Sequence, residues 1–492
     1  MTRTPDDDGT AAPGDVAPTG VAPARATKVS VATLATMVVG SMVGAGVFSL
    51  PQRFAEETGV VGALIAWAVA GTGMLMLAFV FQDLAVRKPQ LDAGVYAYAK
   101  AGFGEYLGFF SAFGYWASAC VGNVTYWVLI MSTVGALVPA LGAGDTVTAV
   151  AASTVGLWLF FFLIRRGVRE ATSLNRVVTI AKVVPILVFV LLTAFALDPA
   201  VLVANLRGAD FSGSLFDQVR GTMLVTVFVF LGVEGANVYS RHARRREDVG
   251  RATVLGFLSV FAVFASVTIV SYGILPASEL AGLRQPSMAG VLEAAVGGWG
   301  SAFVSVGLVV SVLGAYLAWT LMAAEVLFVA AKDDDMPRFL RGVNTADVPV
   351  PALLLTALTA QTFLLVTLLS QNAFDFALNL TSSLALVPYL LAAGYAFKLA
   401  RSPERPRGGV LRRDLVVGAL ATLYTAFLLF AAGLTYLLVS FVVYAPATVL
   451  FVMARREQGR RLFSPREVVI LVVSLVGAVV GVVALVAGWI HL

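Results

Sequence analysis

The first long apolar segment of the chain contains the sequence Gly40-Ser41-Met42-Val43-Gly44-Ala45-Gly46-Val47-Phe48-Ser49-Leu50-Pro51. Three glycines are unexpected here, because each one weakens a helix by about 1 kcal/mol relative to alanine. In a membrane, non-helical backbone survives only where it is buried in protein or lines a polar cavity. The stretch therefore predicts an interrupted helix, whose second half begins with free N–H groups that can bind a carboxylate or a phosphate. The alternative is a packing face of small residues, which is common between membrane helices.

The composition around this stretch is that of a membrane protein. Of the 492 residues, 59% are hydrophobic and 13% are charged. Apolar runs of about 20 residues, the length that crosses a bilayer, recur along the chain. The single cysteine, Cys120, excludes an intramolecular disulfide and a cysteine metal cluster, and two histidines leave no plausible zinc site. We expect an all-α polytopic membrane protein with no metal site and no cofactor.

The apolar runs predict about thirteen transmembrane helices. Residues 1–28, rich in Ala, Pro, Gly and Asp, are expected to be a disordered cytoplasmic tail. Residues 29–400 hold spans one to ten, the expected core, and residues 401–492 hold spans eleven to thirteen. The predicted spans are 29–57, 60–84, 105–138, 144–164, 172–196, 217–240, 251–275, 300–331, 350–371, 373–399, 413–433, 435–454 and 467–489. Two short interfacial helices are expected at Gly94–Gly102 and Met288–Gly297.

The distribution of Lys and Arg sets the predicted orientation, since these residues concentrate on cytoplasmic loops. With the N-terminus inside, the cytoplasmic side collects basic clusters such as Arg165–Arg169, Arg241–Arg251 and Arg455–Arg466. The opposite side has only Arg53, Arg207, Arg220 and Arg284. An odd number of spans then places the C-terminus outside. Lipid headgroups or nucleic acid could also attract such runs, but their alternation with the spans favours topology, and we expect no nucleic-acid partner.

A second interruption lies in span six, at Phe228-Val229-Phe230-Leu231-Gly232-Val233-Glu234-Gly235-Ala236-Asn237. It lies five spans after the first, and because five is odd, two such halves have opposite orientations in the membrane. Paired broken helices in an inverted repeat mark the substrate site of many transporters. The pair favours a binding site over a packing face at Gly44.

The two interruptions predict complementary binding groups. Span one enters from the cytoplasm, so its outer half begins near Ala45 and Gly46 with free N–H groups, and the glycines Gly44 and Gly46 allow a carboxylate to approach closely. The first half of span six ends near Leu231 with free carbonyl groups. A carboxylate at one end and an ammonium at the other are what an amino acid presents.

Two charged residues within the spans stand out. Glu234 is predicted at mid-membrane, where it can contact a cationic substrate, carry a proton or couple binding to gating, or else act as a hydrogen-bonded structural acid. Lys182 of span five is predicted either as a fixed internal cation or as a side chain that extends to the cytoplasmic face.

Other polar and aromatic residues within the spans are weaker candidates. Trp319 in span eight either makes a cation–π contact with a substrate or packs in the core. In spans three and ten, residues that either line a cavity or join helices are Tyr115, Asn123, Thr125, Asn379, Thr381, Ser382, Ser383 and Tyr389. No phosphate loop, nucleophile elbow or metalloprotease motif is present, which disfavours an enzyme. Paired helix breaks favour an alternating-access carrier over a channel.

Several motifs together resemble the amino acid–polyamine–organocation transporters, and among them the basic amino acid/polyamine antiporters. The chain is most similar to the arginine/ornithine antiporters and lysine permeases of that group, which share its thirteenth span. The motifs extend from residue 30 to about 400 and comprise Gly44-Ala45-Gly46-Val47-Phe48-Ser49-Leu50-Pro51, Val86-Arg87-Lys88-Pro89-Gln90-Leu91-Asp92-Ala93-Gly94-Val95-Tyr96-Ala97-Tyr98-Ala99, Gly114-Tyr115-Trp116, Gly122-Asn123, Phe230-Leu231-Gly232-Val233-Glu234-Gly235-Ala236, Trp319-Thr320-Leu321 and Leu386-Val387-Pro388-Tyr389-Leu390.

This resemblance implies a five-plus-five inverted repeat with the substrate between spans one, three, six, eight and ten. It assigns the substrate carboxylate to Ala45 and Gly46, and the ammonium to the carbonyls of Phe228, Val229 and Leu231. Trp319 would pack on the cationic side chain, with Tyr115 and Tyr389 closing the pocket. Glu234 matches an acid that couples gating to substrate or pH. Lys182 matches a lysine that, in several relatives, stands at the position where sodium binds in sodium-coupled transporters, which argues against sodium dependence.

The chain also departs from the arginine/agmatine exchangers of this group. They carry Asn and Ser in the first break, where this chain has Ser41 and Ala45, and a Trp gate where this chain has Phe228. The resemblance implies a plasma-membrane carrier for arginine, ornithine or lysine, with arginine/ornithine exchange expected first. Proton-coupled lysine uptake is the alternative, and a channel or nutrient sensor is disfavoured. A homodimer is a further possibility that the family suggests.

Overall fold

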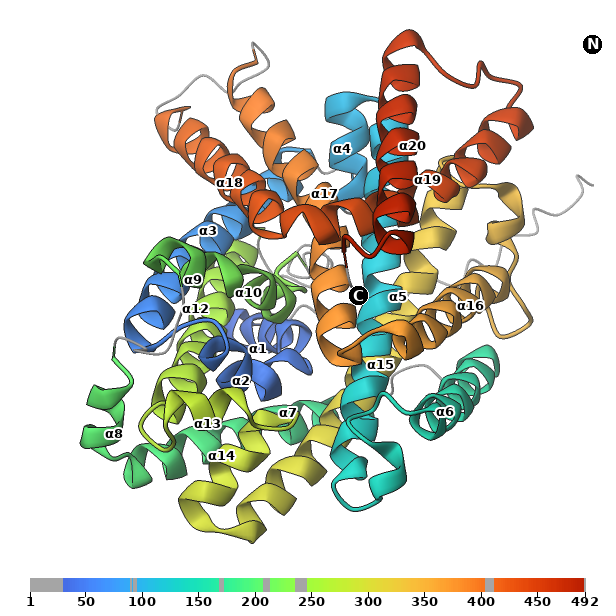
Figure 1. Ribbon diagram of the computed structural model, residues 1–492. Coiled ribbons are helices and arrows are strands. Elements are labelled where there is room, and N and C mark those ends of the chain that lie inside the picture. The colour runs from blue at the N-terminus through green and yellow to red at the C-terminus, as the bar shows by residue number, and fades with distance from the viewer. Residues whose placement is uncertain are drawn as a thin grey trace, which may run out of the picture.

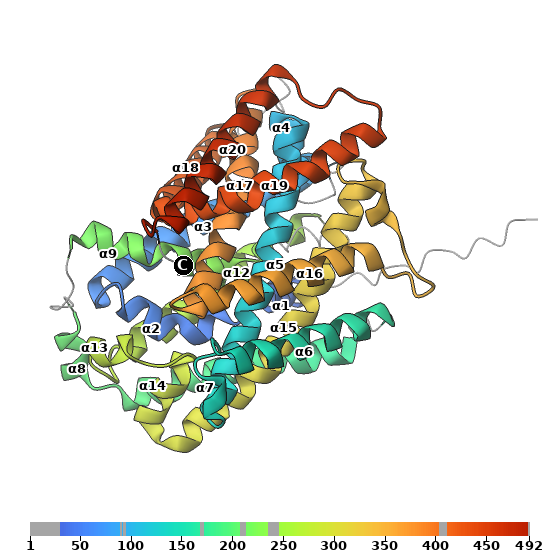
Figure 2. The same cartoon turned by 45° about the vertical axis from the view of Figure 1, so that its right-hand side comes forward.

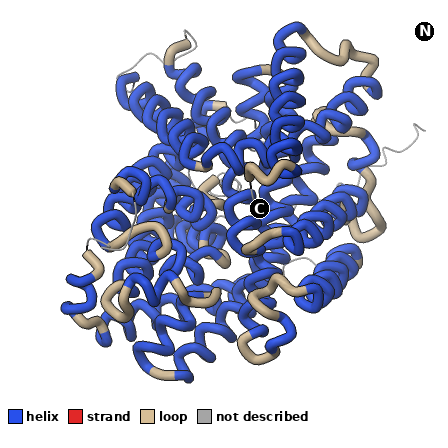
Figure 3. The backbone as a smooth tube through the Cα atoms, in the orientation of Figure 1, coloured by secondary structure: helices blue, strands red, loops and turns tan. Residues whose placement is uncertain are grey.

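The computed structural model describes residues 30–88, 91, 95–167, 172–206, 213–234, 246–402 and 411–490. Every regular element in these ranges is helical (Figure 3). Ten of the helices are long and apolar enough to span a membrane, or eleven if one bent pair near the N-terminus counts as a single span. This confirms the predicted all-α polytopic class. The predicted tail at residues 1–28 lies outside the described residues.

The long helices follow the predicted spans. They are α3 (Val60–Arg87), α5 (Glu105–Gly135), α6 (Val147–Arg165), α7 (Thr172–Ala196), α12 (Arg246–Ser271), α15 (Gly298–Lys332), α16 (Val350–Val366), α17 (Ala373–Ala400), α18 (Leu411–Ala431), α19 (Gly433–Glu457) and α20 (Pro465–Val486). The predicted spans 172–196 and 217–240 correspond to α7 and to two short helices, and none of these three is among the ten. The count of thirteen therefore stays a prediction.

Shorter helices connect the spans. Two of them, α4 (Val95–Phe103) and α14 (Ser287–Val296), lie where short helices were expected. The others are α8 (Pro199–Ala204), α13 (Ala277–Ala281), η2 (Pro139–Leu141), η4 (Arg338–Arg341) and η5 (Thr367–Leu369).

Helices α5 and α17 form the centre of the molecule. They pack along each other, and α15 also packs on α5 (Figures 1 and 2). In the 18-residue apolar stretch of α5, 94% of the residues are buried, against 17% in the corresponding stretch of α20. A membrane helix that is buried all round belongs to the core, whereas one with an exposed apolar surface faces lipid. The site described below is built on α5 and α17.

The first span is broken where its glycines predict. Helix α1 (Val31–Met42) ends, and η1 (Gly46–Ser49) and α2 (Leu50–Ala55) continue in a direction bent by 49°. The hydrogen-bond ladder of α1 closes with Val43 N–H donating to the Val39 carbonyl (2.9 Å), and the next ladder opens with Phe48 N–H donating to the Ala45 carbonyl (3.1 Å). The N–H groups of residues 44–47 have no hydrogen-bond partner among the described residues.

The second break lies against the first. Helices α9 (Leu215–Gly221) and α10 (Met223–Phe230) form the part of span six that precedes it. Helix α10 ends at Phe230, close to the predicted end at Leu231, and Gly232 follows with φ +101°. A Cβ atom on Gly232 would lie 2.6 Å from the Ser41 carbonyl oxygen, and the Ser41 hydroxyl donates to the Gly232 carbonyl (3.2 Å). Glycine is therefore required by both backbone conformation and contact. The motif residues Gly235 to Asn237 lie outside the described residues.

Candidate functional site

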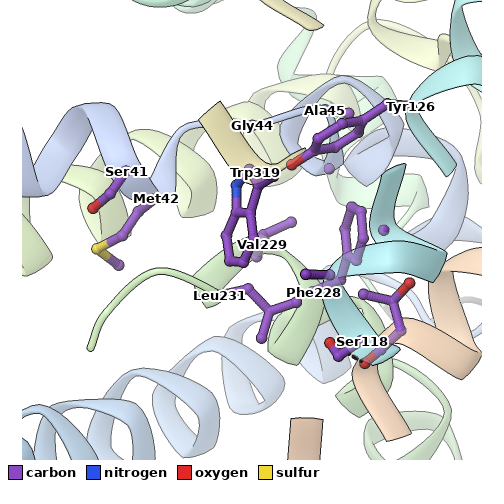
Figure 4. A pocket seen from close by; sticks show the side chains of 14 residues that line it. Ser41, Met42, Gly44, Ala45, Ser118, Tyr126, Phe228, Val229, Leu231 and Trp319 are labelled. Carbon is purple, nitrogen blue, oxygen red and sulfur yellow. Dashed lines mark hydrogen bonds between the residues drawn. The ribbon is translucent and has the colours of Figure 1, made fainter. Parts of the chain in front are cut away.

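A pocket lies where the two breaks meet α5, α15 and α17. Its volume is only about 20 Å³, which is room for about one water molecule, so the walls of the pocket lie close together in this structure. Figure 4 shows the side chains around it. The lining residues are Ser41, Met42, Gly44, Ala45, Gly46, Ser118, Ala119, Gly122, Tyr126, Phe228, Val229, Leu231, Trp319 and Thr381.

The pocket brings together most of the residues predicted as substrate-binding. They come from four separate parts of the chain and are Ser41, Gly44, Ala45, Gly46, Phe228, Leu231, Trp319 and Thr381. Four further predicted residues, Tyr115, Asn123, Glu234 and Tyr389, do not line the pocket. They belong to hydrogen-bonded clusters described below.

The end of the pocket at the first break is rich in donors. The backbone N–H groups of Gly44, Ala45 and Gly46 are unpaired among the described residues. A Cβ atom on Gly46 would lie 2.7 Å from both Phe228 Cδ1 and Val229 Cγ1, so that only glycine lets this backbone approach the end of α10. Free N–H groups in a buried site favour an anion, such as a carboxylate.

Another part of the lining carries an aromatic ring, and an unpaired acceptor lies near it, outside the lining itself. Trp319 of α15 lines the cavity (Figure 4), as expected for a ligand contact rather than an interface anchor. Next to it, the Thr320 hydroxyl accepts a hydrogen bond from Asn123 Nδ2 (3.0 Å). The buried Asn123 Oδ1 has no partner in the part of the chain that the structure describes. Such an acceptor favours a donor that arrives with a ligand.

Glu234 is buried and held by three donors. The hydroxyls of Tyr115 and Tyr389 donate to its two carboxylate oxygens (2.6 and 2.5 Å), and Gly232 N–H donates to Oε2 (3.2 Å). The two tyrosines were expected to close the pocket. In the structure, they join the second break to α5 and α17 through Glu234, because a buried carboxylate needs its hydrogen bonds satisfied.

Lys182 of α7 is buried, with 7% of its surface exposed. Its Nζ donates to the Gly40 carbonyl in the last turn of α1 (3.3 Å). The carbonyl end of a helix carries partial negative charge, which a cation stabilises. The Lys182 ammonium therefore lies at the carbonyl end of α1, next to the first break.

An ion-pair cluster joins α2 to α17 at the predicted outer end of the first span. Arg53 pairs with Asp375 (2.9 Å) and with Glu56. The neighbouring Gln52 pairs with Gln285, and its N–H donates to the Ser287 hydroxyl (3.2 Å). The sequence analysis used Arg53 only for topology. No local pattern pairs it with Asp375, which is 322 residues away.

On the predicted cytoplasmic side, α4 is tied to the segment after α15. Lys100 pairs with Asp335 (2.5 Å), and the Tyr96 hydroxyl donates to Asp333 (3.0 Å). Burial raises the pKa of the Asp335 carboxyl, and the nearby Lys100 ammonium opposes that shift. Both ends of the pocket region are therefore held by polar contacts between distant elements.

The sequence analysis gave no binding role to five lining residues: Met42, Ser118, Ala119, Gly122 and Tyr126. Four of them lie on α5, which is so completely buried that its sequence does not show which face is turned to a ligand. The Ser118 hydroxyl donates to the Thr381 carbonyl (2.8 Å), which fixes α5 against α17 at the pocket (Figure 4). Ser118 and Tyr126 lie four residues before and four residues after Gly122, so all three lie on one face of the helix. These two polar residues were the sequence signal that could have identified the lining face of α5.

Comparison with known proteins shows the family of the chain. Residues 29–454 match the amino acid permease family. The chain is 46% identical to the arginine/ornithine antiporter of Pseudomonas aeruginosa, over 94% of this chain and 98% of the relative. It is 40% identical to the L-lysine transport protein of Corynebacterium glutamicum (95% and 97% covered) and 35% identical to the arginine/agmatine antiporter of Chlamydia pneumoniae (89% and 92% covered). The chain, a multi-pass membrane protein, belongs to the amino acid permease family.

Proposed function

We propose that this protein is a secondary transporter for cationic amino acids and that it exchanges arginine for ornithine by alternating access. The observation that carries the proposal is the pocket between the two broken helices, with unpaired N–H groups at the first break and the carbonyl end of α10 at the second. These groups suit the carboxylate and ammonium of an amino acid. The antiporter relative that is 46% identical over nearly its whole length supports the choice of substrates.

In this proposal, each part of the substrate has its own contacts. The carboxylate binds the N–H groups of Ala45 and Gly46, with Gly44 leaving room for it. The ammonium binds the carbonyls of Phe228, Val229 and Leu231. The cationic side chain extends towards Trp319, where a cation–π contact contributes about 0.5–2 kcal/mol. Ser41 and Thr381 complete the polar lining, and Asn123 Oδ1 is an acceptor close to the cationic end.

Glu234 and Lys182 are proposed as the coupling residues. The carboxylate of Glu234 joins the second break to α5 and α17 through Tyr115 and Tyr389, so a change in its protonation alters contacts between moving elements. The ammonium of Lys182 occupies the carbonyl end of α1, which favours transport without sodium.

The remaining architecture follows the transporter plan. We propose a five-plus-five inverted repeat over residues 29–400, with spans eleven to thirteen in residues 401–492. The protein is placed in the cell membrane, with the tail at residues 1–28 and the N-terminus in the cytoplasm and the C-terminus outside. The paired breaks and the positive-inside pattern support these assignments. A homodimer is proposed on the family resemblance alone. Light scattering of the purified protein, corrected for bound detergent, gives the molar mass that tests it.

Proton-coupled lysine uptake is the second candidate, because a lysine transport protein is 40% identical to this chain. Exchange and uptake differ in one measurable respect. An exchanger reorients slowly when empty, so that substrate is needed on both sides of the membrane.

The test is uptake of labelled arginine by purified protein in proteoliposomes. We expect fast uptake into vesicles loaded with ornithine and little uptake into empty vesicles without a proton gradient. Loading with lysine and with agmatine defines the range of exchange partners. Equal uptake into empty and ornithine-loaded vesicles contradicts exchange. Uptake of lysine that depends on an imposed proton gradient, without exchange, favours the second candidate.

A further inference from the structure

Tyr126 of α5 is a polar pocket residue to which the proposed function gives no role. The residue is buried, with 6% of its surface exposed, and it lines the cavity. No hydrogen bond joins its hydroxyl to any of the described residues. Buried tyrosine hydroxyls usually have a partner, so an unpaired one at a cavity wall points to a ligand.

The Tyr126 hydroxyl lies at the first break. It is the nearest atom to a Cβ atom placed on Gly44, at 3.2 Å. Figure 4 shows the ring extending from α5 across the cavity to Gly44 and Ala45. The hydroxyl therefore lies beside the unpaired N–H groups that begin at Gly44.

The other hydroxyls of the pocket are already engaged. Ser118 donates to the Thr381 carbonyl (2.8 Å), and Thr381 donates to the Ala377 carbonyl (2.7 Å). Ser41 donates to the Val38 carbonyl (2.8 Å). Among the described lining residues, Tyr126 is thus the hydroxyl whose hydrogen is not committed to the protein.

We propose that the Tyr126 hydroxyl donates a hydrogen bond to the carboxylate of the substrate and selects amino acids over their decarboxylated amines. This inference rests on the proposed function, because it assumes that the carboxylate binds at the first break. A phenol donates strongly to a charged acceptor, and here it adds a side-chain donor to a set of backbone donors. An amine without the carboxylate leaves all of these donors unpaired in a desolvated site. Sites built to hydrogen-bond one group reject analogues that lack it.

The test compares L-arginine with agmatine, which has the same guanidinium group but no carboxylate. Equilibrium binding to purified full-length protein is measured for wild type and Tyr126→Phe. A hydrogen bond to a charged group accounts for roughly tenfold or more in affinity. We expect Tyr126→Phe to weaken arginine binding by about that factor and to leave agmatine binding within about twofold of wild type. Tyr424→Phe, a matched change in buried α18, should alter neither affinity.

The decisive quantity is the ratio of arginine affinity to agmatine affinity. An unchanged ratio in Tyr126→Phe overturns the proposal, whether both affinities fall together or neither falls. If Tyr126→Phe does not yield folded protein, Tyr126→Met is judged by the same ratio. Wild-type protein that binds none of arginine, ornithine and lysine is a different result, since it contradicts the proposed function itself.

Discussion

Replacing Gly232 with alanine tests whether contact between the two breaks maintains the site. Two costs arise in the structure. The backbone at Gly232 has φ +101°, where an L side chain costs of order 1–3 kcal/mol. The new Cβ would also lie 2.6 Å from the Ser41 carbonyl oxygen, a backbone atom that cannot rotate away. Overpacking of this kind costs about 1–3 kcal/mol more.

Two other glycines separate these costs. Gly297 has a similar φ of +91° but no atom within 4 Å of its Cβ position, so Gly297→Ala carries the backbone strain alone. Gly298 has neither a positive φ nor an atom within 4 Å, so Gly298→Ala should be close to neutral. Relative to Gly297→Ala, we expect Gly232→Ala to lose a further 1–3 kcal/mol or so, a factor of roughly 5 to 150 in the population of the intact site.

The assays are thermal unfolding in detergent and exchange of labelled arginine in proteoliposomes. Gly232→Ala should lower the melting temperature more than Gly297→Ala does, and it alone should reduce exchange at saturating substrate. If the two variants behave alike in both assays, the contact between Ser41 and Gly232 does not maintain the site, and the reasoning from the paired breaks fails.

Three further substitutions test individual groups. Trp319→Ala should weaken arginine binding by roughly 2- to 30-fold through loss of the cation–π contact, whereas Trp299→Ala, 58% exposed and outside the pocket, should not; equal affinities would remove Trp319 from the site. Glu234→Gln should slow exchange and flatten its dependence on pH, because an amide cannot accept on both of its polar atoms from Tyr115 and Tyr389; an unchanged pH profile would assign Glu234 to structure. Lys182→Met should abolish exchange by removing the cation at the Gly40 carbonyl, and intact, sodium-independent exchange in this variant would contradict its role as an internal cation.

The helix breaks could be predicted from sequence because glycine has a local effect. A glycine-rich run in an otherwise apolar segment disrupts helical hydrogen bonding wherever the segment folds. The helix stops at Met42, and its second half begins at Gly46, where it was expected. Gly232, with its positive φ, marked the second break for the same reason. The residues on these two runs were consequently the ones that the pocket brought together.

Contacts between distant helices could not be predicted in the same way. Helix α5 is apolar and buried on all sides, so its periodicity does not distinguish the face that carries Tyr126 from the others. Glu234 was recognised as an unusual acid, but its tyrosine donors come from spans three and ten and depend on tertiary packing. The same holds for Arg53 and Asp375, which no spacing rule connects.

In the proposed function, recognition of the cationic side chain and coupling to gating use different groups. None of the described residues that line the pocket is an Asp or a Glu. A buried acid paired with the substrate would be left as an uncompensated charge each time the substrate departs, which costs several kcal/mol. Trp319 and the Asn123 carbonyl oxygen can attract a cation without that cost, so release to either side of the membrane stays possible. Glu234, in contrast, accepts its hydrogen bonds from Tyr115, Tyr389 and Gly232 of the protein itself. Its carboxylate is therefore better placed to respond to protonation or helix movement than to hold the substrate, which is why Glu234→Gln is expected to change the pH profile more than the affinity for arginine.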